Sequence, residues 1–196
     1  MVYEVLGSEK LYQGEIVAVR RDTVRMPGGS HADREVVEHV DSVAVVALNS
    51  AGELLLLRQY RHPAAEYLWE LPAGLRDQNL EQAEEAARRE LAEETGWHAE
   101  RWHTLVDLRP SPGMSTEVVR VYLARQLTHH PRAGEAEGEE TDLKTRWVDL
   151  PTAVREVLDG RITNGLAVAG VLAADAVVGL REDRIRAADV SWPDAT

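Results

Sequence analysis

Hydrophobic and polar positions alternate with two different periods along the chain. Residues 14–26 alternate roughly with period two, and residues 34–39 do so again after a Pro-Gly-Gly-Ser turn, which predicts an antiparallel β meander. Residues 42–48 form a continuous apolar run, typical of a strand buried on both faces. Residues 49–52 should turn the chain so that residues 53–57 pair back on that strand. Further strands are expected at 102–108, 118–124 and 146–148.

Helical spacing dominates residues 79–96. Small apolar residues recur there near the 3.6-residue period and predict a narrow packing face, formed by Ala83, Ala86, Ala87 and Leu91. Asn79 suits the N-cap, with Gln82 at the reciprocal capping-box position, and Gly96 suits a left-handed C-cap. Two more helices are expected, at 151–158 and from 164 onward. The polar stretch 129–141 should be a surface loop, and the charged tail beyond Gly179 should be partly disordered.

The other face of the central helix carries Glu90, Glu93 and Glu94. Like charges three or four residues apart on a helix cost roughly 0.2–0.5 kcal/mol per pair. Arg89 can pair with Glu93, which leaves Glu90 and Glu94 without an obvious cation in the sequence. Such hard oxygen ligands suit Mg²⁺ or Mn²⁺. The alternative is an ordinary solvated acidic face.

The string Arg-Glu-Leu-Ala-Glu-Glu-Thr-Gly-Trp, residues 89–97, resembles the second half of the Nudix box. Glu81 stands eight positions before Arg89, as that pattern requires. Six residues rather than five separate Gly74 from Glu81, which we interpret as a one-residue insertion in the loop before the helix. The helical register of the box is unaffected by such an insertion.

The resemblance extends to the ADP-ribose pyrophosphatase branch of the Nudix hydrolases. Leu-Trp-Glu-Leu-Pro-Ala-Gly leads into the box, Pro112 follows Gly96 by sixteen residues, and an acidic loop contains Glu139 and Glu140. The resemblance implies an α/β fold, with a mixed sheet between helices and an N-terminal antiparallel meander. It also implies a homodimer that shares its N-terminal strands. We therefore expect a meander at 1–40, a Nudix domain at 41–180 and a tail at 181–196.

The resemblance also implies roles for individual residues. Glu90, Glu94 and the carbonyl of Ala73 would hold Mg²⁺, with Mn²⁺ as the alternative ion, and Glu93 either completes this cluster or is held by Arg89. Glu81 either supports the loop through Arg89 or reaches the metal through water. A glutamate of the acidic loop would act as the base, Glu139 being favoured over Glu140. The reaction would convert ADP-ribose and water to AMP and ribose 5-phosphate. The box glycines Gly74 and Gly96 are structural.

Substrate recognition follows from the same resemblance. The candidate contacts are Arg61, Arg34, Met114, Glu117 and Trp69, with Arg34 reaching in from the other subunit. Arg61 has an equally good interpretation as a surface residue beside Glu66 or Glu70. For Trp69 a place in the core competes with stacking on adenine.

Composition narrows the function classes. A length of 196 residues favours one domain of ordinary size, and a net charge of −12 argues against a nucleic-acid-binding surface. There is no cysteine, the N-terminus lacks the pattern of a signal peptide, and no apolar stretch reaches membrane-spanning length, so we expect a cytoplasmic protein.

Two alternative functions remain open. One is hydrolysis of another nucleoside diphosphate compound, such as an ADP-sugar, NADH or a dinucleoside polyphosphate. The other is a non-catalytic nucleotide-sensing regulator, against which the intact box carboxylates and the acidic net charge both argue.

Overall fold

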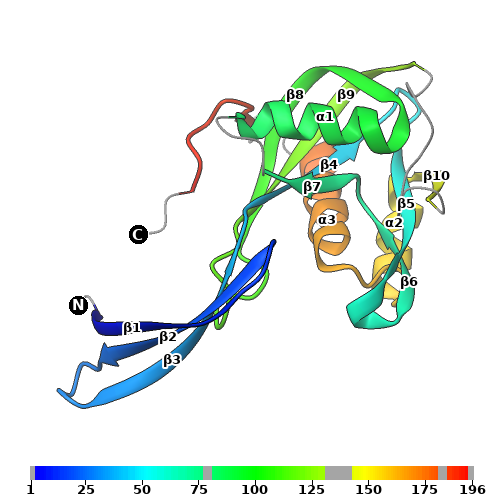
Figure 1. Cartoon of the computed structure of the whole chain (residues 1–196). Coiled ribbons are helices and arrows are strands. Elements are labelled where there is room, and N and C mark those ends of the chain that lie inside the picture. Colours follow the sequence, from blue (N-terminus) through cyan, green and yellow to red (C-terminus); the bar gives the residue numbers. More distant parts are fainter. Residues whose placement is uncertain (1–2, 77–80, 131–142, 181–184, 194–196) are drawn as a thin grey trace. The chain divides into compact units, whose positions relative to one another are not determined.

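The computed structural model describes residues 3–76, 81–130, 143–180 and 185–193 (Figure 1). The chain divides into two compact units. One unit holds the N-terminal residues up to Asp41 together with Arg109–Val118. The other holds Ser42–Leu108 and the chain from Val119 onward. We describe each unit by itself.

The first unit is built on a three-stranded antiparallel sheet in the order β1-β2-β3, which confirms the predicted meander. Its strands are β1 (Glu4–Gln13), β2 (Val17–Arg25) and β3 (His31–His39). The segment Arg109–Val118 attaches to β3, because the Val37 amide donates to the Met114 carbonyl at 2.7 Å and the Thr116 amide to the Val37 carbonyl at 3.0 Å. A segment distant in sequence is thereby fixed to the N-terminal sheet.

The second unit contains two sheets. A five-stranded mixed sheet has the order β11-β8-β9-β4-β7, and a three-stranded sheet has the order β10-β5-β6. The strands of the first are β4 (Ser42–Ala47), β7 (Ala73–Leu75), β8 (Trp97–Leu108), β9 (Val119–His129) and β11 (Arg186–Ala187). Those of the second are β5 (Glu53–Arg61), β6 (Glu66–Glu70) and β10 (Lys144–Asp149), with a 3-10 turn, η1 (His62–Ala64), between β5 and β6.

Helices cover both faces of the five-stranded sheet (Figure 1). They are α1 (Ala83–Thr95), α2 (Leu150–Leu158) and α3 (Gly165–Leu180). Val43 and Val45 of β4 pack in one core cluster with α1, whereas Ala44 and Val46 pack in the other with α2 and α3. Every residue of β4 is buried. This two-sided burial explains the continuous apolar run and confirms the predicted mixed sheet between helices.

The predicted pairing of residues 53–57 with the apolar strand is wrong beyond the turn. The turn itself forms, since the Asn49 amide donates to the Glu53 carbonyl at 2.9 Å and Leu48 bridges Leu54. From there β5 pairs with β6 and β10 instead. Both edges of β4 are already occupied, by β7 and β9, so no edge is left for β5.

The start of α1 also differs from the prediction. The N-cap is Gln82, whose backbone amide donates to the Glu85 carboxylate at 3.0 Å, and Asn79 lies outside the described residues. Glu85 stands three positions after Gln82, so these two residues form the reciprocal cap one turn later than expected. At the other end Gly96 adopts the predicted left-handed conformation, with φ 71°.

The C-terminal tail is more ordered than its composition suggests. Residues 185–193 are described, and within them β11 pairs antiparallel with β8. The sequence predicted only partial disorder beyond Gly179, and residues 181–184 and 194–196 lie outside the described residues. The expected surface loop at 129–141 lies outside the described residues from position 131. No helix within the described ranges is long and apolar enough to cross a membrane.

Candidate active site

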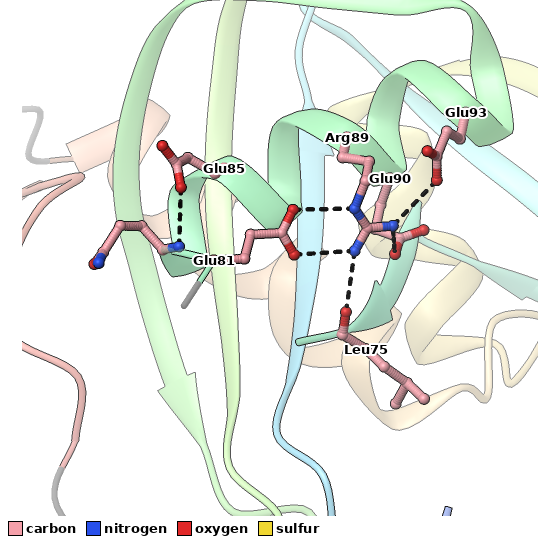
Figure 2. A network of polar contacts seen from close by, with 7 residues as sticks. Leu75, Glu81, Glu85, Arg89, Glu90 and Glu93 are labelled. Carbon is pink, nitrogen blue, oxygen red and sulfur yellow. Dashed lines mark hydrogen bonds and ion pairs between the residues drawn. The ribbon is translucent and has the colours of Figure 1, made fainter. Parts of the chain in front are cut away.

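Arg89 of α1 gathers three carboxylates and one backbone carbonyl (Figure 2). Its Nε and Nη2 donate to the two carboxylate oxygens of Glu81 at 3.0 and 3.2 Å. Its Nη1 donates to Glu90 at 2.5 Å and to Glu93 at 3.1 Å, and Nη2 also donates to the Leu75 carbonyl at 3.3 Å. Because α1 begins at Ala83, Glu81 precedes the helix and turns back onto Arg89.

The electrostatics of this cluster hold Arg89 firmly in its charged form. Hydrogen bonds to Glu81 raise the pKa of Arg89 above its ordinary value, burial opposes that change, and the charge of Glu90 together with hydrogen bonds to Glu90 and Glu93 adds to the increase. The guanidinium therefore acts as a fixed cation that keeps three carboxylates close together. It also supplies the cation for Glu90 that the sequence alone did not reveal.

Gly74 makes room for the Glu90 carboxylate. A Cβ placed on Gly74 would lie 2.1 Å from Glu90 Cδ and 2.2 Å from its Oε1, closer than real atoms approach. Gly74 belongs to β7, where it pairs with Val43 of the buried strand β4. The acidic face of α1 is thus in direct contact with the backbone of β7.

Glu94 contacts the same strand one residue earlier. The Ala73 amide donates to Glu94 Oε2 at 3.0 Å, and Ala73 pairs with Ala44 of β4. Hydrogen bonding to a carboxylate favours its charged form. The structure therefore brings Ala73, Gly74, Glu90 and Glu94 together at one contact between β7 and α1, beside the cluster around Arg89.

Comparison with known proteins decides the family. Residues 38–165 match the model of the NUDIX domain, and residues 3–37 match that of the nucleoside diphosphate sugar hydrolase N-terminal domain. The chain belongs to the Nudix family.

Individual proteins similar to this chain include two ADP-ribose pyrophosphatases and one solved structure. The chain is 48% identical to an ADP-ribose pyrophosphatase of Mycobacterium tuberculosis (strain ATCC 25618 / H37Rv), over 98% of this chain and 92% of that protein. It is 31% identical to an ADP-ribose pyrophosphatase of Bacillus subtilis (strain 168), over 81% and 87%. A solved structure of an ADP compounds hydrolase aligns with a TM-score of 0.79 at 20% identity, over 92% of this chain and 97% of that one, which shows the shared fold.

Nudix hydrolases typically use a divalent metal, and the residues at the β7–α1 contact fit one. Carboxylate and carbonyl oxygens are the hard donors that Mg²⁺ and Mn²⁺ prefer, and the Gly74 backbone leaves space for the Glu90 carboxylate. Within the described residues, however, no group of three or more His, Asp or Glu side chains is arranged to hold an ion. Glu90 and Glu93 are both bonded to Arg89.

Two positions were predicted for Glu93, either within the metal cluster or bonded to Arg89. The structure shows the bond to Arg89. Its side chain is 53% exposed, whereas that of Glu90 is 14% exposed. Glu81 likewise pairs with Arg89, whose Nε lies 3.0 Å from Glu81 Oε1, and both predicted roles of Glu81 stay predictions. The predicted bases Glu139 and Glu140 lie outside the described residues.

Arg61 forms a close ion pair within the second unit. Its Nε and Nη2 donate to Glu70, with Nη2 at 2.6 Å from Oε2, and Glu70 is only 4% exposed. Both residues that the sequence suggested lie beside Arg61, since Glu70 forms this ion pair and Glu66 stands opposite Arg61 in the pairing of β5 with β6. Trp69 packs against the hydrophobic core, and the Arg146 guanidinium lies 4.0 Å from its ring centroid. Substrate roles for Arg61 and Trp69 stay predictions.

The other candidate contacts belong to the N-terminal unit. Arg34 lies exposed on β3, and its Nη1 donates to the Asp33 carbonyl at 2.8 Å. Met114 is exposed, and the Glu117 carboxylate lies 3.8 Å from His39 Nδ1. Their substrate roles are likewise untested predictions.

Sequence reasoning missed a second charged cluster, which lies in the second unit. Arg120 of β9 is 1% exposed, and its Nε donates to Asp107 of β8 at 2.7 Å. Arg186 of β11 donates to the same carboxylate at 2.6 Å. A signal was present, because Arg120 is the one charge inside the apolar run 118–124, and a buried charge requires a partner.

Proposed function

We propose that this chain hydrolyses the pyrophosphate linkage of ADP-ribose to give AMP and ribose 5-phosphate. The observation that carries the proposal is the 48% identity, over nearly the whole chain, to a protein that bears the name of this activity. The cluster of carboxylates against the backbone of β7 provides a chemical basis for it.

The chemistry follows from the charge of the substrate. A pyrophosphate is shielded from nucleophiles by its own anionic oxygens, and the chain carries a net charge of −12, so an anionic substrate needs local positive charge. Bound Mg²⁺ would supply it, by neutralising those oxygens and lowering the pKa of a water molecule. Glu90, Glu94 and the Ala73 carbonyl would hold the ion, with Mn²⁺ as a possible substitute.

The remaining box residues would organise those ligands. Arg89 holds Glu81 and Glu93, and it fixes the side chain of Glu90. Glu139, or else Glu140, would accept the proton of the attacking water. Arg61 would contact a phosphate and Trp69 the adenine, while Met114 and Glu117 would line the ribose side.

We further propose a homodimer in which the N-terminal strands are shared and Arg34 reaches the partner's substrate. Supporting this, β1 is exposed along its whole length and carries large apolar side chains, among them Val5 and Tyr12, each more than half exposed. Exposed apolar side chains gathered on one element are typical of an interaction surface.

The experiment that tests the function is a substrate panel with product identification. Purified protein would be incubated with Mg²⁺ and one substrate at a time. The substrates are ADP-ribose, ADP-glucose, GDP-mannose, NADH and a dinucleoside polyphosphate. We expect metal-dependent release of AMP and ribose 5-phosphate, fastest with ADP-ribose. Faster turnover of another compound would transfer the assignment to it, and nucleotide binding without any turnover would favour a sensing role. Hydrolysis in heavy-oxygen water would then show which phosphorus is attacked.

A further inference from the structure

The tail segment 185–193 is anchored to the five-stranded sheet at several points. Strand β11 pairs with β8, and Arg186 donates to Asp107 at 2.6 Å. Arg120 donates to the tail carbonyls of Val190 and Ser191, both at 2.7 Å. Because Arg120 is buried, these charge-assisted bonds lie in a region of low dielectric, where they are strong and where losing one is costly.

This anchoring places the Trp192 ring close to two guanidinium groups. The Arg76 guanidinium lies 4.1 Å from the Trp192 ring centroid, and that of Arg120 lies 5.0 Å from it. Both distances are within the range of cation–π attraction. The same ring packs against the core cluster that contains Ala83 and Ala86 of α1. The tail therefore contacts both the residue after β7 and the helix of the box.

Arg76 directly follows β7, the strand that contacts the carboxylates of the box. Leu75 pairs with Ser42 and accepts a hydrogen bond from Arg89 at 3.3 Å, and Gly74 accommodates Glu90. β7 has only three residues, so its backbone pairing is short. A contact immediately after its last residue is well placed to hold the strand in register.

Arg76 and Trp192 also line a pocket of about 460 Å³, together with Gln82 and Arg88. Both side chains are partly exposed. The stack is therefore not sealed within the core, and its removal should leave the packing on either side of the sheet in place. This separates an effect on β7 from an effect on overall folding.

We propose that Trp192 is a positioning residue of the active site. Its stack with Arg76 fixes the end of β7, and through it Leu75 and Gly74, against Arg89 and Glu90. The part of this inference that concerns metal binding rests on the proposed function, whereas the part that concerns the backbone of β7 does not.

The test measures two quantities other than turnover. Hydrogen exchange, followed by mass spectrometry, reports the protection of a peptide containing Ala73–Leu75, and electron paramagnetic resonance reports the dissociation constant of Mn²⁺. In Trp192→Ala we expect faster exchange in that peptide and Mn²⁺ binding weaker by about 2- to 30-fold, the range that cation–π attraction allows. Trp192→Phe keeps an aromatic face and should stay close to wild type in both measurements.

Two further variants sharpen the result. Arg76→Ala should reproduce both effects of Trp192→Ala, and the double variant should be no worse than either single one, because all three lack the same stack. Trp147→Ala is the matched control: Trp147 is also a partly buried tryptophan packed against the same core cluster, but it lies on β10. It should lower the unfolding temperature without changing exchange in β7.

The outcomes separate the two proposals. Unchanged exchange in β7 in both Trp192→Ala and Arg76→Ala would overturn the positioning role, as would multiplicative effects in the double variant. If Trp192→Ala does not fold, Arg76→Ala alone decides, because it leaves Trp192 in place. If wild type neither binds Mn²⁺ nor hydrolyses ADP-ribose, the proposed function fails, while the exchange comparison still decides the role of Trp192 in β7.

Discussion

Replacing Gly74 with alanine should impair the metal site through a purely steric effect. The added Cβ would lie 2.1 Å from Glu90 Cδ, whereas ordinary van der Waals contact begins near 3.4 Å, so the carboxylate must retreat by more than 1 Å or β7 must move away from β4. Gly74 has no positive φ, so backbone strain is not the cause. The displaced carboxylate would also lose the 2.5 Å hydrogen bond from Arg89.

The size of the effect can be worked from these contacts. Loss of a hydrogen bond between charged groups costs about 1.5–3 kcal/mol of stability where the groups are largely buried, and the side chains of Glu90 and Arg89 are 14% and 20% exposed. A displacement of about 1 Å at a catalytic group can cost roughly a hundredfold in rate. We therefore expect Gly74→Ala to remain folded, with a lower unfolding midpoint and a turnover number reduced by about that factor.

The assay compares Gly74→Ala with Gly165→Ala. A Cβ on Gly165, the first residue of α3, would meet no atom within 4 Å, so that variant should match wild type. Urea unfolding, Mn²⁺ affinity and AMP release from ADP-ribose would be measured on both. Wild-type Mn²⁺ affinity and turnover in Gly74→Ala would refute the reasoning, because Glu90 would then not need its observed position.

Three further predictions concern single side chains. Glu94→Gln should lose most turnover and keep a wild-type circular dichroism spectrum, and unchanged turnover would rule out Glu94 as a metal ligand. Arg61→Ala should destabilise the fold by about 1–3 kcal/mol in urea unfolding, because Glu70 would stay buried without this cation, and a large rise in KM would in addition support a phosphate contact. Burial raises the pKa of Asp107, but hydrogen bonds from Arg120 and Arg186 outweigh burial and hold that pKa below its ordinary value. The stabilisation from Asp107 should therefore be complete above its unfolded pKa of about 3.9 and be lost as pH falls through the lower folded value, so Asp107→Asn should flatten this acid dependence of the unfolding free energy.

The sequence was most informative about features that are determined by residues close together in the chain. The helix of the box, its Gly96 cap and the pairing of Arg89 with Glu93 all follow from residues within about one helical turn of one another, whereas the contact of Glu81 with Arg89 was one of two alternatives implied by the family resemblance. The burial of β4 was also predictable, because a run without polar residues leaves no face for solvent.

Features that depend on distant partners were not predictable in the same way. β5 pairs with β10, where Arg58 lies opposite Lys144, and the local pattern of β5 contains nothing that selects that partner over β4. The order in the tail depends on the buried Arg120, which is remote in sequence from Val190. Register and partner choice are set by competition for sheet edges across the whole chain, and a local pattern does not record that competition.

The sharing of one guanidinium among several acids has a consequence for how tightly an ion would be retained. A cation entering beside Glu90 would compete with Arg89 for that carboxylate, so the bond that Arg89 already makes opposes part of the free energy of ion binding. We therefore expect weaker binding and faster exchange of the ion than at a site whose carboxylates have no competing cation. For a catalyst that must let go of two anionic products after every cycle, a readily exchanged ion makes release easier.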